Sequence, residues 1–291
     1  MRAFCLIALL AAAPALADVA VRDDAGRTVR LTQPARRIVS LAPHITENLF
    51  AIGAGSRIVG TVEFSNYPEE AKRIRQIGSY EKIDLEAVAA QRPDLVIAWE
   101  SGNIASQVAR LRAIGLEVVV TESRRIEDVP ADLERLGALS GAHVGARAAA
   151  AKFRSRLAEL RARHAGQPKV RVFYEVWNQP LMTVGGNQII SDAIRLCGGE
   201  NVFGALKPMA AAVTVEAVLA ADPEAIVASG MDEARPQWLD DWRRWPSMTA
   251  VARNNLFFVP PDHLQRHTPR LADGVEALCA HLETARARRP R

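Results

Sequence analysis

The chain alternates short, almost wholly apolar runs with longer stretches whose apolar positions recur at helical spacing. Runs of this kind are typical of strands covered on both faces, as in parallel α/β sheets. One segment occurs twice, because residues 84–98 reappear as residues 214–228 at an offset of 130 with no insertion. Each copy predicts a short capped helix that carries a glutamate, a proline that ends it, and an apolar strand. An offset of one domain length indicates two similar lobes rather than a solenoid.

The same patterns locate other elements in each half of the chain. In the first half we expect strands at 37–41, 58–60 and 118–120 and helices at 43–52 and 104–114. In the second half we expect strands at 171–176 and 256–259, a helix at 189–196 and a final helix that contains Cys279. The alternation predicts an α/β fold with mainly parallel sheets.

A long run between the two halves is the candidate linker. Residues 143–164 are rich in Ala, Arg, Leu and Glu, and Gly145 is their only Gly or Pro. As a helix the run would be a rod about 33 Å long. We therefore expect an N-terminal lobe at 18–141, a rigid backbone helix at 142–166 and a C-terminal lobe at 167–291, with little hinge closure between the lobes.

The N-terminus predicts secretion. Residues 1–17 combine Arg2, an apolar run and Ala15-Leu16-Ala17, which is the pattern of a cleavable signal peptide. The apolar run is shorter than the roughly 20 residues that span a bilayer. Cys5 lies too early to be a lipoprotein cysteine, so a free periplasmic protein is expected.

Composition and charge exclude some classes of function. The chain is 49% hydrophobic and 24% charged, which is ordinary for a globular protein. Without residues 1–17 it has 36 basic and 33 acidic residues, a balance that gives no indication of nucleic-acid binding. The arginines after the last helical pattern predict a solvated, frayed end: Arg286, Arg288, Arg289 and Arg291.

Two cysteines remain after removal of residues 1–17, Cys197 and Cys279. In an oxidising compartment they favour a disulfide within the second lobe, and two buried free thiols are the alternative. Neither lies in a pattern typical of a reactive thiol, so both are expected to be structural.

No catalytic motif stands out, since the chain has no nucleophile elbow, phosphate-binding loop or His-Glu-x-x-His helix. Ligands of open α/β sheets bind beyond the carboxyl ends of the strands, and two facing lobes form a cleft there. The residues near these ends mix flat aromatics with a few polar groups and suit a large, mostly apolar, planar ligand: Pro43, His44, Phe64, Tyr67, Tyr80, Trp99, Trp177, Met182, Asp262 and Arg266. Ordinary packing is the alternative for each aromatic, and is favoured for Trp238, Trp242 and Trp245.

The histidines near these ends give no protein-built metal site. His263 and His267 are four residues apart but lack further ligands, so no resident metal or cofactor is expected. His44 is a candidate axial ligand to a metal carried by the cargo. A histidine that caps its helix or faces solvent is the favoured alternative.

Glu86 and Glu216 occupy the equivalent place in the two repeat copies. A carboxylate in the first turn of a helix is favoured by the helix dipole, which is one explanation. The other is that paired acidic groups dock on a two-fold membrane partner that bears arginines.

Together these features resemble the helical-backbone (class III) periplasmic substrate-binding proteins, which serve ABC importers of cobalamin, haem and ferric siderophores. The likeness runs from about Arg37 to Cys279 and is closest to the members that bind cobalamin. The stretches that carry it are Leu41-Ala42-Pro43, Ser65-Asn66-Tyr67-Pro68, residues 93–99, Cys197-Gly198-Gly199-Glu200-Asn201, and Asp262 with Arg266 before Pro269-Arg270.

The resemblance implies roles for individual residues. It implies that Glu86 and Glu216 meet arginine pockets on the transporter, and that Cys197 pairs with Cys279. The positions that contact cobalamin in the family fall into two sets in this chain: Trp99, Asp262 and Arg266 are unchanged in type, while His44, Phe64, Tyr80, Val176, Met182 and Ala210 differ.

The sequence thus predicts a monomeric, non-enzymatic binding protein. It would capture cobalamin or a related corrinoid between the lobes and deliver it to an ABC permease dimer in the inner membrane. A haem or ferric-siderophore cargo, with His44, His263 or His267 near the metal, is the first alternative. A secreted metal-dependent hydrolase is the second.

Overall fold

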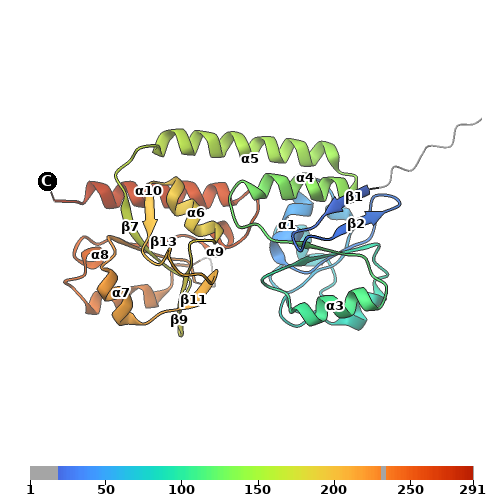
Figure 1. Ribbon diagram of the computed structural model, residues 1–291, viewed down its shortest axis with the longest axis horizontal. Helices are drawn as coiled ribbons and strands as arrows, with labels where there is room; N and C mark the ends of the chain where they lie inside the picture. The colour runs from blue at the N-terminus through green and yellow to red at the C-terminus, as the bar shows by residue number, and fades with distance from the viewer. Residues whose placement is uncertain (1–18, 231–233, 291) are drawn as a thin grey trace, which may run out of the picture.

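The computed structural model describes residues 19–230 and 234–290 and places them in two α/β lobes connected by a long helix (Figure 1). The predicted signal peptide lies outside the described residues. An antiparallel hairpin, β1 (Val19–Arg22) and β2 (Thr28–Leu31), opens the first lobe and was not expected from the sequence.

The sheet of the N-terminal lobe has four parallel strands in the order β4-β3-β5-β6. They are β3 (Ile38–Ser40), β4 (Ile58–Gly60), β5 (Leu95–Trp99) and β6 (Val118–Thr121). Most of their residues are buried, as wholly apolar strands require. The helices are α1 (Pro43–Ala51), α2 (Leu85–Ala90) and α3 (Ala105–Ala113), with 3-10 turns at Gly55–Arg57 and Glu69–Arg73.

The sheet of the C-terminal lobe repeats this topology, with four parallel strands in the order β10-β7-β12-β13. They are β7 (Val170–Glu175), β10 (Gly199–Asn201), β12 (Ala225–Ala228) and β13 (Leu256–Phe258). In each sheet the strand that comes first in sequence, β3 or β7, occupies the second position. The repeat is confirmed, since α2 leads into β5 as α7 (Val215–Ala221) leads into β12.

The C-terminal lobe has further elements around this sheet. A small antiparallel sheet joins β8 (Trp177–Asn178), β9 (Leu181–Val184) and β11 (Ala210–Ala212). The remaining helices are α6 (Ile189–Leu196), a 3-10 helix at Gln237–Arg244, α8 (Thr249–Ala252), α9 (Pro261–Leu264) and α10 (Leu271–Ala287).

The backbone helix is confirmed as α5 (His143–His164). Its buried residues form one stripe at helical spacing, from Ala146 to His164. Beneath it lie α10 of one lobe and α4 (Asp128–Ser140) of the other, nearly end to end (Figure 1). The sequence did not predict α4, whose pattern is interrupted by Pro130 and Gly137.

Two features fasten the end of the C-terminal lobe. The disulfide is confirmed, because Cys197 at the end of α6 is bonded to Cys279 of α10, 82 residues away. Loop entropy gives such a bond about 4–5 kcal/mol of stabilisation.

The prediction of a frayed arginine tail is wrong. Arg286 donates to the carbonyl oxygens of Pro168 and Cys197, at 2.7 and 2.6 Å, since the ends of neighbouring elements leave acceptors beside α10.

The next arginines of the tail are held in the same way. Arg288 donates to the Asn254 carbonyl oxygen at 2.5 Å, and Arg289 contacts both carboxylate oxygens of Glu224 at 2.9 Å. Arg291 lies outside the described part of the chain.

A buried carboxylate joins the two lobes directly. Glu47 on α1 is 2% exposed and accepts two hydrogen bonds from Arg270, at 2.7 and 2.6 Å. The Thr268 hydroxyl donates to the same carboxylate at 2.6 Å. Nearby, the Asn48 amide donates to the His267 carbonyl oxygen at 2.9 Å. The segment after α9 is thereby fixed against α1.

Removal of the Glu47 carboxylate is predicted to destabilise the protein strongly. We expect Glu47→Ala to lower the free energy of unfolding by about 3–5 kcal/mol, because it leaves the Arg270 guanidinium without its buried partner. As a control, Glu134→Ala breaks the exposed pair with Arg154 and should cost about 1 kcal/mol or less. Urea unfolding measures both, and equal costs would contradict the assignment of Glu47 as the inter-lobe anchor.

A second prediction concerns a buried carboxyl group at the end of β7. Glu175 is 2% exposed, and burial raises its pKa to about 8 although the Trp242 indole donates to it at 2.8 Å. When a carboxyl group has a higher pKa in the folded than in the unfolded protein, its protonated form stabilises the fold. This contribution to the free energy of unfolding is lost as the pH rises from the unfolded-state pKa to the folded-state pKa. We therefore expect the wild type to lose stability relative to Glu175→Gln between about pH 5 and pH 8.

The difference between the two proteins is the quantity to measure, by urea unfolding at each pH. Burial lowers the pKa values of His44 and His267, and these groups act on stability in the opposite direction. The exposed Glu200→Gln serves as the control. A difference that does not change with pH would show that Glu175 is ionised in the folded protein.

Candidate ligand-binding cleft

Two adjoining cavities lie between the lobes, at the carboxyl ends of the parallel strands. The smaller has a volume of about 170 Å³ and the larger about 380 Å³. Both are lined by Trp99, which ends β5, and by Gln265, which follows α9. The position agrees with the general rule that open α/β sheets bind ligands beyond their carboxyl strand ends.

Nine of the twelve residues that the strand ends or the family resemblance place near the ligand line these cavities, and the other three are Tyr67, Trp177 and Met182. The smaller is lined by Pro43, His44, Phe64, Tyr80, Trp99, Asp262 and Arg266, and the larger by Trp99, Val176 and Ala210. Met182 does not line either cavity. Its strand partners are Trp177 and Ala212 in the small antiparallel sheet.

Trp99 is held in place by its own loop. The Asn103 side chain accepts a hydrogen bond from the Trp99 backbone at 2.7 Å. Its amide donates to the carbonyl oxygens of Leu41 and Tyr80, at 2.9 and 2.8 Å, so one side chain ties three cleft segments together. A Cβ at Gly102 would lie 1.8 Å from the indole, and only glycine leaves room for the ring.

His44 is buried in the cleft, so the favoured interpretation of a capping or exposed histidine is wrong. It is 7% exposed, and α1 has no side-chain cap. Its ring lies 5.2 Å from the Trp99 ring and 5.3 Å from the His267 ring, between centroids. Burial lowers the pKa of His44 well below its usual value, and the nearby His267 and Arg266 lower it further.

Arg266 connects the lobes across the smaller cavity. Its guanidinium donates to the Phe64 carbonyl oxygen at 3.0 Å and pairs with Asp262 at 2.9 Å. Phe64 has a positive φ of 63°, a conformation that non-glycine residues adopt at ligand sites when their surroundings hold it. Its side chain is 56% exposed at the mouth of the cavity.

Several cleft residues were missed by the sequence analysis. They are Ser101, Glu122, Ser123, Val184, Gln188, Ile190, Met209, Pro261 and Gln265, while His267 was expected in the cleft only for a haem or siderophore cargo. Glu122 and Ser123 come directly after β6, so the strand-end rule identifies them if it is applied to that strand. The residues from α6 and from the loop before β11 reach the cleft only through tertiary packing, which leaves no local signal.

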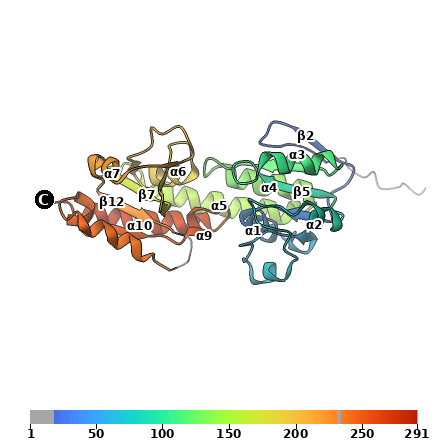
Figure 2. The same ribbon diagram turned by 90° about the horizontal axis from the view of Figure 1, so that it is seen from below.

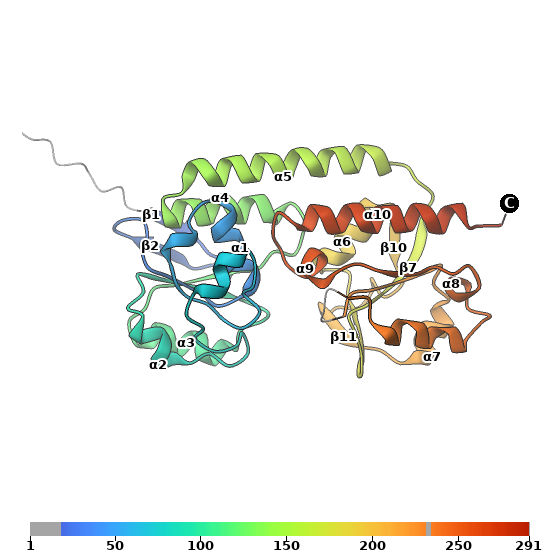
Figure 3. The same cartoon turned by 180° about the vertical axis from the view of Figure 1, so that it is seen from behind.

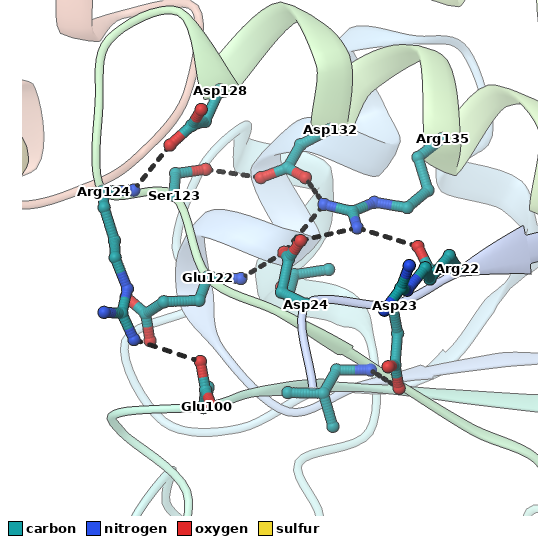
Figure 4. A network of polar contacts seen from close by, with 12 residues as sticks. Arg22, Asp23, Asp24, Glu100, Glu122, Ser123, Arg124, Asp128, Asp132 and Arg135 are labelled. Carbon is teal, nitrogen blue, oxygen red and sulfur yellow. Dashed lines mark hydrogen bonds and ion pairs between the residues drawn. The ribbon is translucent and has the colours of Figure 1, made fainter. Parts of the chain in front are cut away.

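Glu122 connects the cleft to the N-terminal hairpin (Figure 4). Its carboxylate accepts a hydrogen bond from the Ser101 backbone at 2.8 Å, and its own backbone donates to Asp24 at 2.7 Å. Asp24 in turn pairs with Arg135 on α4 at 2.8 Å. Burial raises the pKa of Glu122, although the bond from Ser101 opposes this effect.

A larger cavity, of about 880 Å³, runs along the edge strand β10 and reaches the amino ends of the C-terminal strands, away from the other two cavities. Its lining includes Lys169 just before β7 and Gly198 just before β10, together with His164 at the end of α5. These are amino ends of parallel strands, where ligands of this fold class are not expected. The inter-lobe cavities are therefore the better candidate site.

The predicted docking carboxylates share one face of the molecule. Glu86 and Glu216 are exposed residues in the first turns of α2 and α7. Asp84 and Thr214 cap these helices through equivalent bonds to the backbone nitrogens of Ala87 and Ala217, at 2.9 and 3.2 Å. Both helices lie on the side opposite α5, one in each lobe (Figures 2 and 3).

The tryptophans of the C-terminal lobe pack among themselves. The Trp177 and Trp238 rings are 6.4 Å apart, and the Trp242 and Trp245 rings 5.4 Å. Neither inter-lobe cavity is lined by any of these four, which agrees with a structural role.

Within 19–230 and 234–290, no group of three or more His, Cys, Asp or Glu side chains is placed to hold a metal ion. In the same ranges no helix has the length and apolarity needed to span a membrane.

Comparisons with known proteins give a consistent result. The family model of periplasmic binding proteins matches residues 38–263. A vitamin B12-binding protein of Vibrio parahaemolyticus is 34% identical over 260 residues, which cover 88% of this chain and 93% of the relative. A vitamin B12-binding protein of Vibrio cholerae is 33% identical over 253 residues, covering 87% and 91%.

Solved structures give the same picture. The crystal structure of the periplasmic vitamin B12 binding protein of Vibrio cholerae matches with a TM-score of 0.80 and 32% identity, over 87% of this chain and 98% of that one. A periplasmic heme binding protein from Pseudomonas aeruginosa matches with a TM-score of 0.74 and 26% identity, over 84% and 92%. The chain therefore belongs to the periplasmic binding protein family, a family of binding proteins and not of enzymes.

Proposed function

We propose that this protein captures vitamin B12, or a related corrinoid, between its lobes and delivers it to the permease of an ABC importer. The observation that carries the proposal is the pair of inter-lobe cavities around Trp99. Relatives that cover nearly the whole chain are vitamin B12-binding proteins, which supports a corrinoid as the cargo.

Each wall of the cleft has its own part in binding. Trp99, Tyr80 and Phe64 offer aromatic faces and edges to a large planar ring, and such contacts stabilise a complex beyond the area they bury. Val176 and Ala210 add apolar surface on the opposite lobe. Asp262 and Arg266 supply the polar groups that orient the amide side chains of a corrinoid.

The family and the sequence of residues 1–17 support a periplasmic location. We propose that residues 1–17 form a cleavable signal peptide and that the mature protein acts as a periplasmic monomer. The lobes then correspond to residues 18–141 and 167–291, with the backbone helix between them.

A haem cargo is the second candidate, and one observation favours it. His44 and His267 line the cleft beside Trp99, and imidazole is a common axial ligand of haem iron. The two cargoes are distinguished by direct titration.

One prediction of the proposed function concerns Trp99. We expect purified protein to bind cyanocobalamin, and Trp99→Ala to weaken binding by about 10- to 100-fold, because the macrocycle loses an aromatic contact worth roughly 1.5–3 kcal/mol. Trp245→Ala, remote from the cleft, is the matched control and should bind as the wild type does. Isothermal titration measures all three. Absence of cyanocobalamin binding together with tight haemin binding would transfer the proposal to haem.

The second prediction concerns docking. We expect Glu86→Ala combined with Glu216→Ala to weaken binding to the importer complex at least tenfold, because each lobe loses a charge-assisted contact worth about 1–3 kcal/mol. Cargo affinity should not change, since neither residue lines the cleft. The control is Glu134→Ala combined with Glu159→Ala, which removes two carboxylates from the α4 and α5 face. Equal loss in both double variants would rule out a specific docking role.

A further inference from the structure

Two buried imidazoles lie side by side in the cleft. His44 lines the smaller cavity and His267 the larger, and their ring centroids are 5.3 Å apart. They are 7% and 4% exposed. Buried polar groups are normally hydrogen-bonded, so two buried imidazoles without evident partners require an explanation.

The hydrogen bonds of these rings show what is missing. In the described part of the chain, no hydrogen bond reaches a ring nitrogen of either histidine, and the Nδ1 atom of His267 is fully buried without a partner. His44 lines the smaller cavity, where an atom of a ligand can approach its ring. An unpaired acceptor in such a place favours a ligand that supplies the missing bond.

Imidazole is a common axial ligand of a metal held in a macrocycle. It coordinates through the lone pair that one nitrogen of the neutral ring has.

An ion held by the protein alone does not fit the site. No group of three or more potential ligands is present within residues 19–230 and 234–290, and two imidazoles leave the coordination shell of an ion incomplete. A metal in a macrocycle brings its equatorial ligands with it. It needs only one axial donor from the protein.

The ring orientations agree with axial coordination. The His44 and His267 planes stand at 85° and 90° to the Trp99 plane. A macrocycle stacked on the indole would lie parallel to it and would meet both imidazoles edge-on. Because the metal–nitrogen bond lies in the imidazole plane, an axial imidazole stands perpendicular to the macrocycle, as these rings do.

We propose that His44 coordinates the central metal of a corrinoid cargo that carries an exchangeable axial ligand, with His267 as the residue that positions its ring. The inference rests on the proposed function. In this exchange of axial ligands, the bond from cobalt to a bound water breaks and a bond from cobalt to a nitrogen of the His44 imidazole forms. The water leaves, and no electron or proton is transferred. A corrinoid with a firmly held cyanide cannot react in this way and binds through the other cleft contacts.

The test compares aquacobalamin with cyanocobalamin on the full-length mature protein. We expect the absorption bands of aquacobalamin to shift on binding, with an affinity at least about tenfold above that for cyanocobalamin. In His44→Gln the shift should disappear and the two affinities should become equal.

The controls separate the possible failures. His143→Gln changes an exposed histidine at the start of α5 and should behave as the wild type does. A cooperative urea-unfolding transition in His44→Gln, at the same urea concentration as in the wild type, shows that the variant is folded. Binding of both corrinoids without a spectral shift would overturn the inference and leave the proposed function intact. A shift that persists in His44→Gln but is lost in His267→Gln would overturn the assignment to His44. Binding of neither corrinoid would overturn both proposals.

Discussion

The contact between the carboxylate of Glu47 and the guanidinium of Arg270 determines how the two lobes sit together. A charge this deeply buried is tolerated only when it is paired and fully hydrogen-bonded, so α1 and the segment after α9 have one mutual position. That same segment brings Arg266 and His267 into the cleft. The inter-lobe anchor and one wall of the binding site are therefore a single structural unit.

This arrangement limits the motion of the lobes. The backbone helix α5 spans both lobes on one side, and the Glu47 network joins them near the cleft. Large hinge closure would have to separate a buried carboxylate from its arginines, at a cost of several kcal/mol. The stiff helix alone suggested limited motion from the sequence. The network gives a second and independent reason, because it acts at the site where closure would occur.

A feature could be predicted from the sequence when neighbouring residues create it, and could not when its partners lie far away in the sequence. The repeat, most strands of the two parallel sheets and α5 could be predicted, because caps, prolines and apolar periodicity are local signals. Glu47 looked like an ordinary helix residue, because its partners lie more than 200 positions away. The arginine tail was misjudged for the same reason, since its acceptors belong to distant elements. Cleft residues were found where strand ends or the family resemblance indicated them, and missed where α6 and the loop before β11 reach the cleft through packing alone.

The two lobes share a topology, yet their equivalence is kept on one face and lost on another. Around the cleft, the N-terminal lobe presents Trp99 and Tyr80, whereas the C-terminal lobe presents Asp262, Gln265 and Arg266. On the face opposite α5, Glu86 and Glu216 follow matching caps in matching helices. A corrinoid has different groups on its two sides and does not require equivalent walls. A two-fold permease does require equivalent contacts. The two lobes thus differ where they line the cleft and match where Glu86 and Glu216 lie. This is what we expect of a carrier that binds an asymmetric cargo and delivers it to a symmetric partner.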